Sequence, residues 1–290
     1  MNYIAKIFSI IIIISFLGAC TERIDINTND AETRLSVFGY ITNKIGRHSI
    51  KITYTAGFFS NEPPQGISNA KVIISDGENE YTLTENKDSL GLYQTDSLFY
   101  GIEGKTYRLD ISLDFDMDGN DEKYYATAYM PLATRVDSVV LAPSIKMPRI
   151  PNLKLYGKVP DSQANYLAIY LRKNSQPQNI FDFFMILTDS YFIGYDITGY
   201  DFPCMITDGI ELNDTVIFKV NCFSEEFAQF ISNASSEVGG SIPIFGGPPA
   251  DVITNIYASD DDNETQIVGF FGAFPWNEKN TISQKDYTGN

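Results

Sequence analysis

Three aspartates at alternate positions, Asp114, Asp116 and Asp118, stand before Gly119 in the sequence DFDMDGND. Carboxylates at this spacing, followed by a glycine, bring oxygen atoms onto one calcium ion while the chain turns sharply. The match is incomplete, because the twelfth position, where a bidentate glutamate closes the shell, is Tyr125, and the flanking residues indicate strands instead of helices. The segment is therefore either a solvated hairpin turn or a calcium site, and we expect no other cofactor.

Cys20 ends the sequence Leu17-Gly18-Ala19-Cys20, which matches the bacterial lipobox, where the thiol is acylated and the cysteine becomes the new N-terminus. The motif follows Lys6 and an apolar run over residues 7–17, which is too short to span a bilayer, since that takes about 20 residues. Residues 1–20 are thus expected to be a lipoprotein signal peptide. The alternative is an ordinary secreted protein whose signal ends near a cysteine.

Two further cysteines, Cys204 and Cys222, remain once Cys20 is acylated, in a compartment that permits oxidation. They lack the short spacing of a zinc knuckle. The sequence leaves two alternatives for them, a disulfide bridge or two separate buried thiols.

Catalysis finds little support in the residue inventory. His48 is the only histidine, and it lies inside an alternating strand, so we expect it on the strand surface without a role. A Ser-His-Asp set would have to use it, and a His-rich zinc site cannot be built from it. No pair of carboxylates is singled out for glycoside hydrolysis. We therefore expect no catalytic residues and no enzyme. The aromatic residues could include a stacking platform, and Trp276 is a candidate for exposure, but core packing explains most of them and no named aromatic is selected as a binding residue.

The chain is strongly acidic. Lys6 is the one basic residue before Cys20, so a chain beginning at Cys20 has 20 basic residues against 37 acidic ones, a net charge of −17. Such a surface is repelled by nucleic acid phosphates and by anionic lipid. The membrane partner is therefore expected to be reached through the lipid anchor alone, and nucleic acid is excluded as a partner.

Alternation of apolar and polar residues dominates the elements that must position these groups. Residues 21–33 are polar and are expected to form a flexible tether. Seven short strands follow within residues 34–135, at the spacing of an N-terminal Ig-like or transthyretin-like β-sandwich. We expect residues 136–276 to form a second β-rich domain with one short helix, which is capped by Ser224 and ends near Asn233. We expect residues 277–290 to form a polar tail. The predicted fold class is all-β.

Several segments occur in a characteristic order along the chain: VFGYIT, SNAKVIISD, GKTYRLDI, FSEEFAQF, PPADVITNIY and VGFFGAF. In this order the chain resembles the Bacteroidota lipoprotein family catalogued as domain-of-unknown-function family 4249. The resemblance implies a lipid-anchored outer-membrane protein, often encoded beside a TonB-dependent receptor, and it supplies no catalytic residues.

The expectation is thus an accessory lipoprotein in nutrient binding or uptake with that receptor. A structural or adhesive surface protein is the alternative, and a glycan- or peptide-processing enzyme a weaker one. Whether the protein lies on the periplasmic or the cell-surface face is left open.

Overall fold

Apolar residues at every second position build the first β-sandwich. In β1 (Leu35–Thr42), Leu35, Val37 and Ile41 are fully buried, and they pack against apolar residues of the facing sheet, among them Leu109 and Ile111 of β7 (Thr106–Leu113). This is the two-residue period of a strand with one face in a core. The computed structural model describes residues 33–55, 63–174, 179–206, 208–238, 253–260 and 267–288, all of which belong to one compact unit.

Each sheet of the first sandwich has five strands, in the orders β16-β1-β2-β6-β5 and β15-β8-β7-β3-β4. The remaining strands are β2 (Ser49–Tyr54), β3 (Lys71–Ser75), β4 (Glu80–Thr82), β5 (Thr84–Glu85), β6 (Leu92–Gln94), β8 (Glu122–Tyr129), β15 (Ile256–Ala258) and β16 (Ile267–Phe274). All pairings are antiparallel except that of β1 with β16, which is parallel.

The second sandwich packs a three-stranded sheet, β13-β10-β9, against a four-stranded sheet, β12-β11-β14-β17. Its strands are β9 (Arg135–Ala142), β10 (Asn152–Lys158), β11 (Tyr166–Lys173), β12 (Met185–Thr188), β13 (Asp196–Pro203), β14 (Thr215–Phe223) and β17 (Trp276–Ile282). A 3₁₀ turn, η2 (Ser190–Phe192), follows β12. Among the described residues there is one α-helix, which confirms the all-β class with a single short helix.

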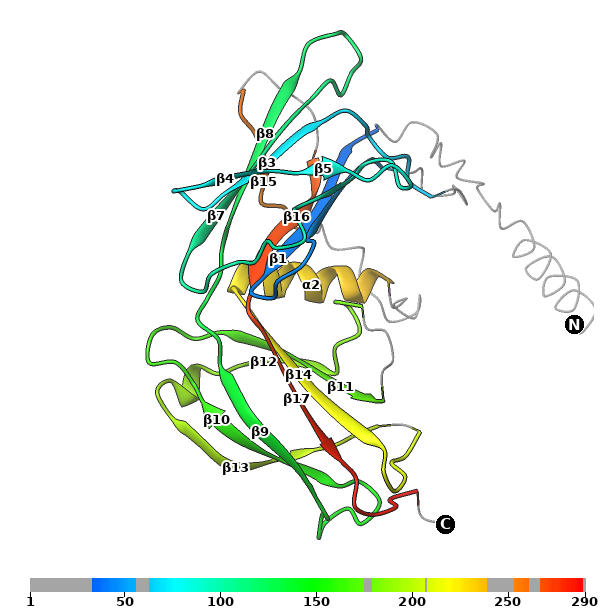
Figure 1. Cartoon of the computed structure of the whole chain (residues 1–290), viewed down its shortest axis with the longest axis vertical. Helices are drawn as coiled ribbons and strands as arrows, with labels where there is room; N and C mark the ends of the chain where they lie inside the picture. The colour runs from blue at the N-terminus through cyan, green and yellow to red at the C-terminus, as the bar shows by residue number, and fades with distance from the viewer. Residues whose placement is uncertain are drawn as a thin grey trace, which may run out of the picture. The chain divides into compact units, whose positions relative to one another are not determined.

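The helix α2 (Glu225–Val238) begins as expected, because the Ser224 hydroxyl accepts a hydrogen bond from the Phe227 amide at 3.3 Å. It runs past Asn233, since no helix-breaking residue follows before Gly239. Phe227 and Phe230 pack with Phe270 of β16 and Phe223 of β14. Figure 1 shows α2 between the sheet that contains β1 and β16 and the sheet that contains β11 and β14.

The expected division after residue 135 falls at the start of β9, whose first residue is Arg135, and the structure assigns later residues differently from the expected ranges. Both β15 and β16 complete sheets of the first sandwich, because open strand edges there find their partners in the C-terminal part of the chain. Residues 277–282, expected in a polar tail, continue β17 on from Trp276. β17 pairs on one side only, with β14, so its exposed polar residues face solvent without cost.

Cys20 and the tether, apart from Thr33, lie outside the described residues. No helix in the described part of the chain is long and apolar enough to cross a membrane.

Candidate ligand-binding site

Strand β14 carries polar side chains on one face only. Val216, Phe218 and Val220 point into the core of the second sandwich, so the alternate residues Lys219 and Asn221 point to the opposite face. In the register with β17, Lys219 stands opposite Glu278 and Asn221 opposite Trp276. Local alternation and pairing thus place an ammonium group, an amide and an indole side by side.

Lys219 has no ion-pair partner among the described residues. Its Nζ lies over the Trp276 ring at 4.1 Å from the centroid and over the Tyr170 ring at 4.9 Å. Glu278, the nearest acidic neighbour in register, instead binds Arg172, with 2.7 Å between Nη2 and Oε2. Burial lowers the pKa of Lys219 to about 8; the charge of Glu278 opposes this shift, and those of Arg172 and Lys44 add to it.

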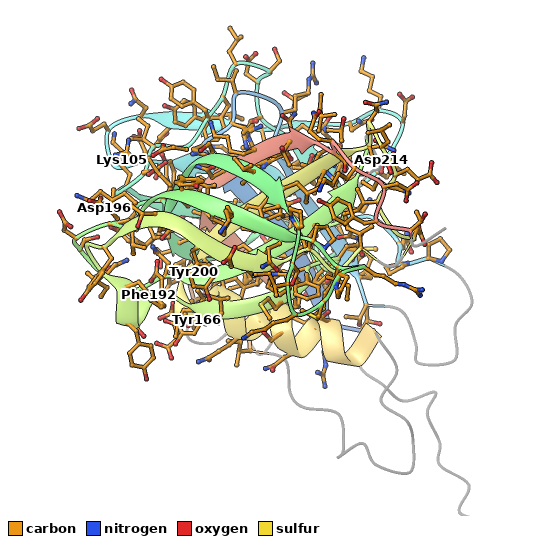
Figure 2. The ribbon with its side chains drawn as sticks, turned by 90° about the horizontal axis from the view of Figure 1, so that it is seen from below. Lys105, Tyr166, Phe192, Asp196, Tyr200 and Asp214 are labelled. Carbon is orange, nitrogen blue, oxygen red and sulfur yellow. The ribbon has the colours of Figure 1, made fainter. Side chains whose placement is uncertain are left out.

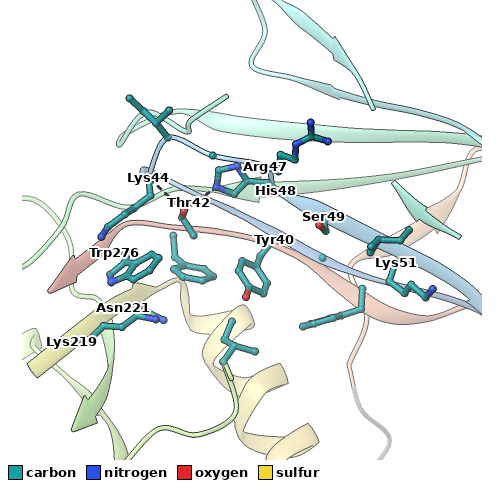
Figure 3. A pocket seen from close by; sticks show the side chains of 17 residues that line it. Tyr40, Thr42, Lys44, Arg47, His48, Ser49, Lys51, Lys219, Asn221 and Trp276 are labelled. Carbon is teal, nitrogen blue, oxygen red and sulfur yellow. Dashed lines mark hydrogen bonds between the residues drawn. The ribbon is translucent and has the colours of Figure 1, made fainter. Parts of the chain in front are cut away.

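The first sandwich supplies the opposite wall. Phe38 and Tyr40 lie on the face of β1 that points away from its own core, and the turn after β1 presents Lys44, whose Nζ lies 4.0 Å from the centroid of Trp276 (Figure 3). The turn is joined to β17 directly, because the Trp276 amide donates to Asn43 Oδ1 at 2.8 Å. One residue, Pro275, separates β16 in the first sandwich from β17 in the second.

Together these elements enclose a cavity of about 520 Å³. It is lined by four cationic residues, Lys44, Arg47, Lys51 and Lys219, by the rings of Tyr40 and Trp276, and by no carboxylate of the described chain. In a chain with 37 acidic and 21 basic residues, such a local surplus of positive charge is unusual. The size is typical of a small-molecule site.

Three side chains of this cavity carry a buried polar atom without a hydrogen-bond partner in the described structure: Asn221 Oδ1, Trp276 Nε1 and His48 Nδ1. Asn221 is 1% exposed and His48 8%. Buried polar atoms are nearly always paired, so unpaired atoms on three side chains that line this cavity mark it as a candidate binding site.

His48 was expected on the strand surface and is buried instead. Its Nε2 lies 2.9 Å from Thr42 Oγ1, and its ring meets Phe99 edge-on. Burial lowers the pKa of His48, with the Gly46 backbone opposing, so the ring is neutral at pH 7. The strand alternation was recognised, but the turn at residues 43–47 folds this position inward.

The acidic hairpin between β7 and β8 brings the predicted calcium ligands together. Asp114, Asp116 and Asp118 each offer an oxygen, and Glu122, which we had not selected, joins them; the four oxygens lie within 4.8 Å of one another. Two oxygens on opposite sides of a calcium ion, each about 2.4 Å from it, have this separation. Asp114 Oδ1 is buried without a partner among the described residues, so the arrangement suits a cation.

The same carboxylates also organise the turn without a metal. Asp114 Oδ2 accepts from the Gly119 amide at 3.1 Å, and Glu122 Oε2 accepts from the Phe115 amide at 2.7 Å. Gly119 has a φ of 92°, a value that suits glycine. Both alternatives for this hairpin therefore remain consistent with the geometry.

Cys204 and Cys222 are free thiols buried in the core of the second sandwich. The proposed disulfide is not formed, and the structure matches the alternative of two buried thiols. Burial raises the pKa of each thiol to about 12, so both stay protonated and unreactive at neutral pH.

A second cavity, of about 330 Å³, opens between the two sheets of the second sandwich. Apolar side chains line most of it, and its deep end holds Asp189, which accepts hydrogen bonds from Thr134 Oγ1 and the Asn165 amide, both at 2.6 Å. Phe192, Asp196 and Tyr200 lie together at one edge of the molecule, away from Asp214 (Figure 2).

The one histidine is neutral and buried and lies 2.9 Å from the buried Thr42 hydroxyl, and the buried Asp189 is bonded to Thr134 and Asn165. The fold and site thus define a two-sandwich all-β protein with a cationic, aromatic cavity where the sandwiches meet.

The chain belongs to the family described as domain of unknown function DUF4249, whose model matches residues 21–280. A search of curated proteins finds no match.

Sequence reasoning selected Trp276 only as a candidate for exposure, and it did not select Tyr40, Lys44, Lys219 or Asn221. A signal for two of these was present in TVIFKVNCF, where Lys219 and Asn221 alternate with apolar residues in an otherwise buried strand. No local pattern places Lys44 beside Trp276, because the two residues are far apart in the sequence. The neighbouring Asn43–Trp276 hydrogen bond joins residues 233 positions apart.

Proposed function

We propose that the protein is a lipid-anchored accessory lipoprotein of the outer membrane that binds a ligand and passes it to a TonB-dependent receptor. The observation that carries the binding role is the cavity at the meeting of the two sandwiches, with its four cationic residues and three unpaired polar atoms. The anchor is supported by the sequence Leu17-Gly18-Ala19-Cys20. The association with a receptor rests on the resemblance of the chain to lipoproteins encoded beside such receptors.

A binding role explains the site better than catalysis does. Its polar groups are lysines, an amide and an indole, which can hold a ligand, and the neutral His48 is bonded to the buried Thr42 hydroxyl instead of to an exposed nucleophile. Strand pairing of β14 with β17 fixes the backbone positions of Asn221 and Trp276, as expected for a pre-formed binding site.

The anchor is tested by the substitution Cys20→Ala. We expect the wild-type protein to incorporate labelled palmitate and to sediment with membranes after alkaline washing, because two or more acyl chains hold it there. The variant should incorporate no label. The control, Cys204→Ala, removes a thiol from the core and should leave labelling unchanged; labelling of Cys20→Ala would contradict the assignment.

The receptor association is tested by purification of the tagged, acylated protein in mild detergent. A stoichiometric outer-membrane receptor in the eluate supports the proposal. Its absence, together with retained attachment of cells to a surface, favours the second candidate, a structural or adhesive protein.

The acidic hairpin favours that second candidate, because a calcium ion held by Asp114, Asp116, Asp118 and Glu122 would stiffen an exposed tip.

A further inference from the structure

The cavity between the sandwiches has the charge of a site for an anion. We infer that it binds a small hydroxylated carboxylate, of the class of sugar acids, with the carboxylate held between Lys44 and Lys219. This inference rests on the proposed binding function and names the chemical class of its ligand.

Lys219 forms no ion pair with a carboxylate of the described residues. A buried ammonium group is costly unless an anion accompanies it. Here the nearby carboxylate, Glu278, is engaged by Arg172 at 2.7 Å, and the Tyr170 and Trp276 rings lie against the Nζ. Lys44 adds a second ammonium over the same indole, at 4.0 Å. An incoming carboxylate would supply the missing counter-charge to both.

The unpaired neutral atoms of the cavity add a second requirement. Trp276 Nε1 can only donate, which suits an anionic or hydroxyl oxygen, whereas Asn221 Oδ1 can only accept and therefore requires a donor on the ligand. His48 Nδ1, in a neutral ring, pairs with a hydroxyl in either tautomer. A ligand with a carboxylate and several hydroxyl groups satisfies all three, whereas a simple fatty acid, whose ionised head can only accept, does not.

The size and surface of the cavity suit such a ligand. The cavity of about 520 Å³ has room for a mono- or disaccharide, and the rings of Phe38 and Tyr40 offer apolar surface for its carbon skeleton. The cationic residues of the lining supply the counter-charge for its carboxylate.

The ionisation of Lys219 gives the site a pH dependence. Because its pKa is about 8, and a bound carboxylate raises it, binding takes up protons near that pH and weakens as the pH rises above it. The charged or titratable groups that face Lys219 are Lys44 from the turn after β1, Tyr170 and Arg172 from β11, and Glu278 from β17.

Trp276 is the only tryptophan of the chain, so its fluorescence reports on this cavity alone. The experiment titrates the full mature protein, in a non-ionic detergent at constant ionic strength, with glucuronate, its neutral counterpart glucose, and inorganic phosphate. We expect a saturable change with glucuronate, none with glucose, and a loss of affinity of at least tenfold between pH 7 and pH 10.

Two variants localise the effect. Lys219→Met should weaken glucuronate binding at least tenfold and remove its pH dependence. Lys279→Met removes an equal charge from an exposed neighbouring position of β17 and should change neither. Each of four outcomes would overturn the inference: equal binding of glucose and glucuronate, a response to phosphate alone, no saturable response to glucuronate, or an unchanged affinity for glucuronate in Lys219→Met.

These outcomes are separable from failure of the proposed function. Absence of glucuronate binding in a protein that is acylated at Cys20 and co-purifies with a receptor refutes the ligand class only. Glucuronate binding without a co-purifying receptor refutes the receptor association and leaves the ligand class standing.

Discussion

Lys219 is an ammonium group held over two aromatic rings, with its nearest carboxylate already paired to an arginine. The rings recover part of the lost hydration, at about 0.5–2 kcal/mol for each cation–π contact. Burial is the main cause of the lowered pKa of Lys219, so the charged form is disfavoured in the folded protein. A residue that is kept at a cost to stability is typical of a binding site.

The substitution Lys219→Met is therefore expected to stabilise the unliganded protein at pH 7. The expected stabilisation is about 1–2 kcal/mol. It is the free energy that corresponds to the pKa change, reduced because the side chain is partly exposed and because the ring contacts are lost. The folded pKa of about 8 lies below the ordinary value of 10.5, so the charged form is disfavoured on folding. The penalty is complete below pH 8 and disappears as the pH rises towards 10.5.

Urea unfolding at pH 7 and pH 10, followed by Trp276 fluorescence, measures this difference. The stabilisation by Lys219→Met should be smaller at pH 10 than at pH 7. The change in the free energy of unfolding caused by Lys279→Met should be near zero at both pH values. A destabilised Lys219→Met variant at pH 7 would mean that the rings outweigh the cost of burial.

At the scale of elements, the hairpin between β7 and β8 concentrates four carboxylates at an exposed tip. Asp116 Oδ1 and Asp118 Oδ1 each accept from a backbone amide two residues later, at 3.1 and 2.7 Å. These bonds fold the loop so that its carboxylates face one another. The negative charges of the carboxylates repel one another unless a proton or a cation neutralises them. The strands on either side hold this geometry in place of the helices of an EF-hand.

We expect calcium to raise the thermal unfolding midpoint by several degrees relative to chelator, because a ligand of the native state stabilises it. For a chain of this size each kcal/mol corresponds to roughly 2–4 °C. Asp114→Asn should abolish the shift. Asp121→Asn is the matched control, since Asp121 lies in the same hairpin but bonds Ser112 Oγ at 2.8 Å outside the cluster. If the unfolding midpoint of the wild-type protein is the same with calcium and with chelator, the hairpin is a solvated turn.

At the scale of the whole described unit, α2 and its phenylalanines join the two sandwiches. Phe227 contacts Phe223 of β14 and Phe270 and Phe274 of β16, with ring centroids 4.9, 5.5 and 5.6 Å apart. Gly272 of β16 leaves room for it, because a Cβ there would lie 2.7 Å from the Phe227 ring. The same packing fixes the distance between β1 and β14, and hence the cavity that they line.

Phe227→Ala is therefore expected to destabilise the protein by about 3–5 kcal/mol, the cost of removing a buried aromatic ring. The measurement is urea unfolding by circular dichroism, and the loosened joint should also weaken ligand binding at the cavity. Gln229→Ala, at an exposed position of the same helix, should change stability by less than about 0.5 kcal/mol. An equal effect of the two variants would show that α2 does not hold the sandwiches together.

Local chemistry alone determined much of this protein. The alternation of Leu35, Val37 and Ile41 predicts a strand with one buried face, and Ser224 before two glutamates predicts the start of a helix. Asp114, Asp116 and Asp118 are close in sequence, so their convergence could also be anticipated. The fold class follows from such patterns, because the period of a strand and the cap of a helix depend on neighbouring residues.

Only the tertiary structure decided which distant segments meet. β16 becomes the parallel partner of β1, His48 turns inward, and Lys44, Lys219 and Trp276 gather around one cavity. The physical reason is that strand edges and apolar faces are generic, and many pairings satisfy them locally. The choice among them is made by the packing of the entire core, including the phenylalanines of α2, which no short stretch of sequence specifies.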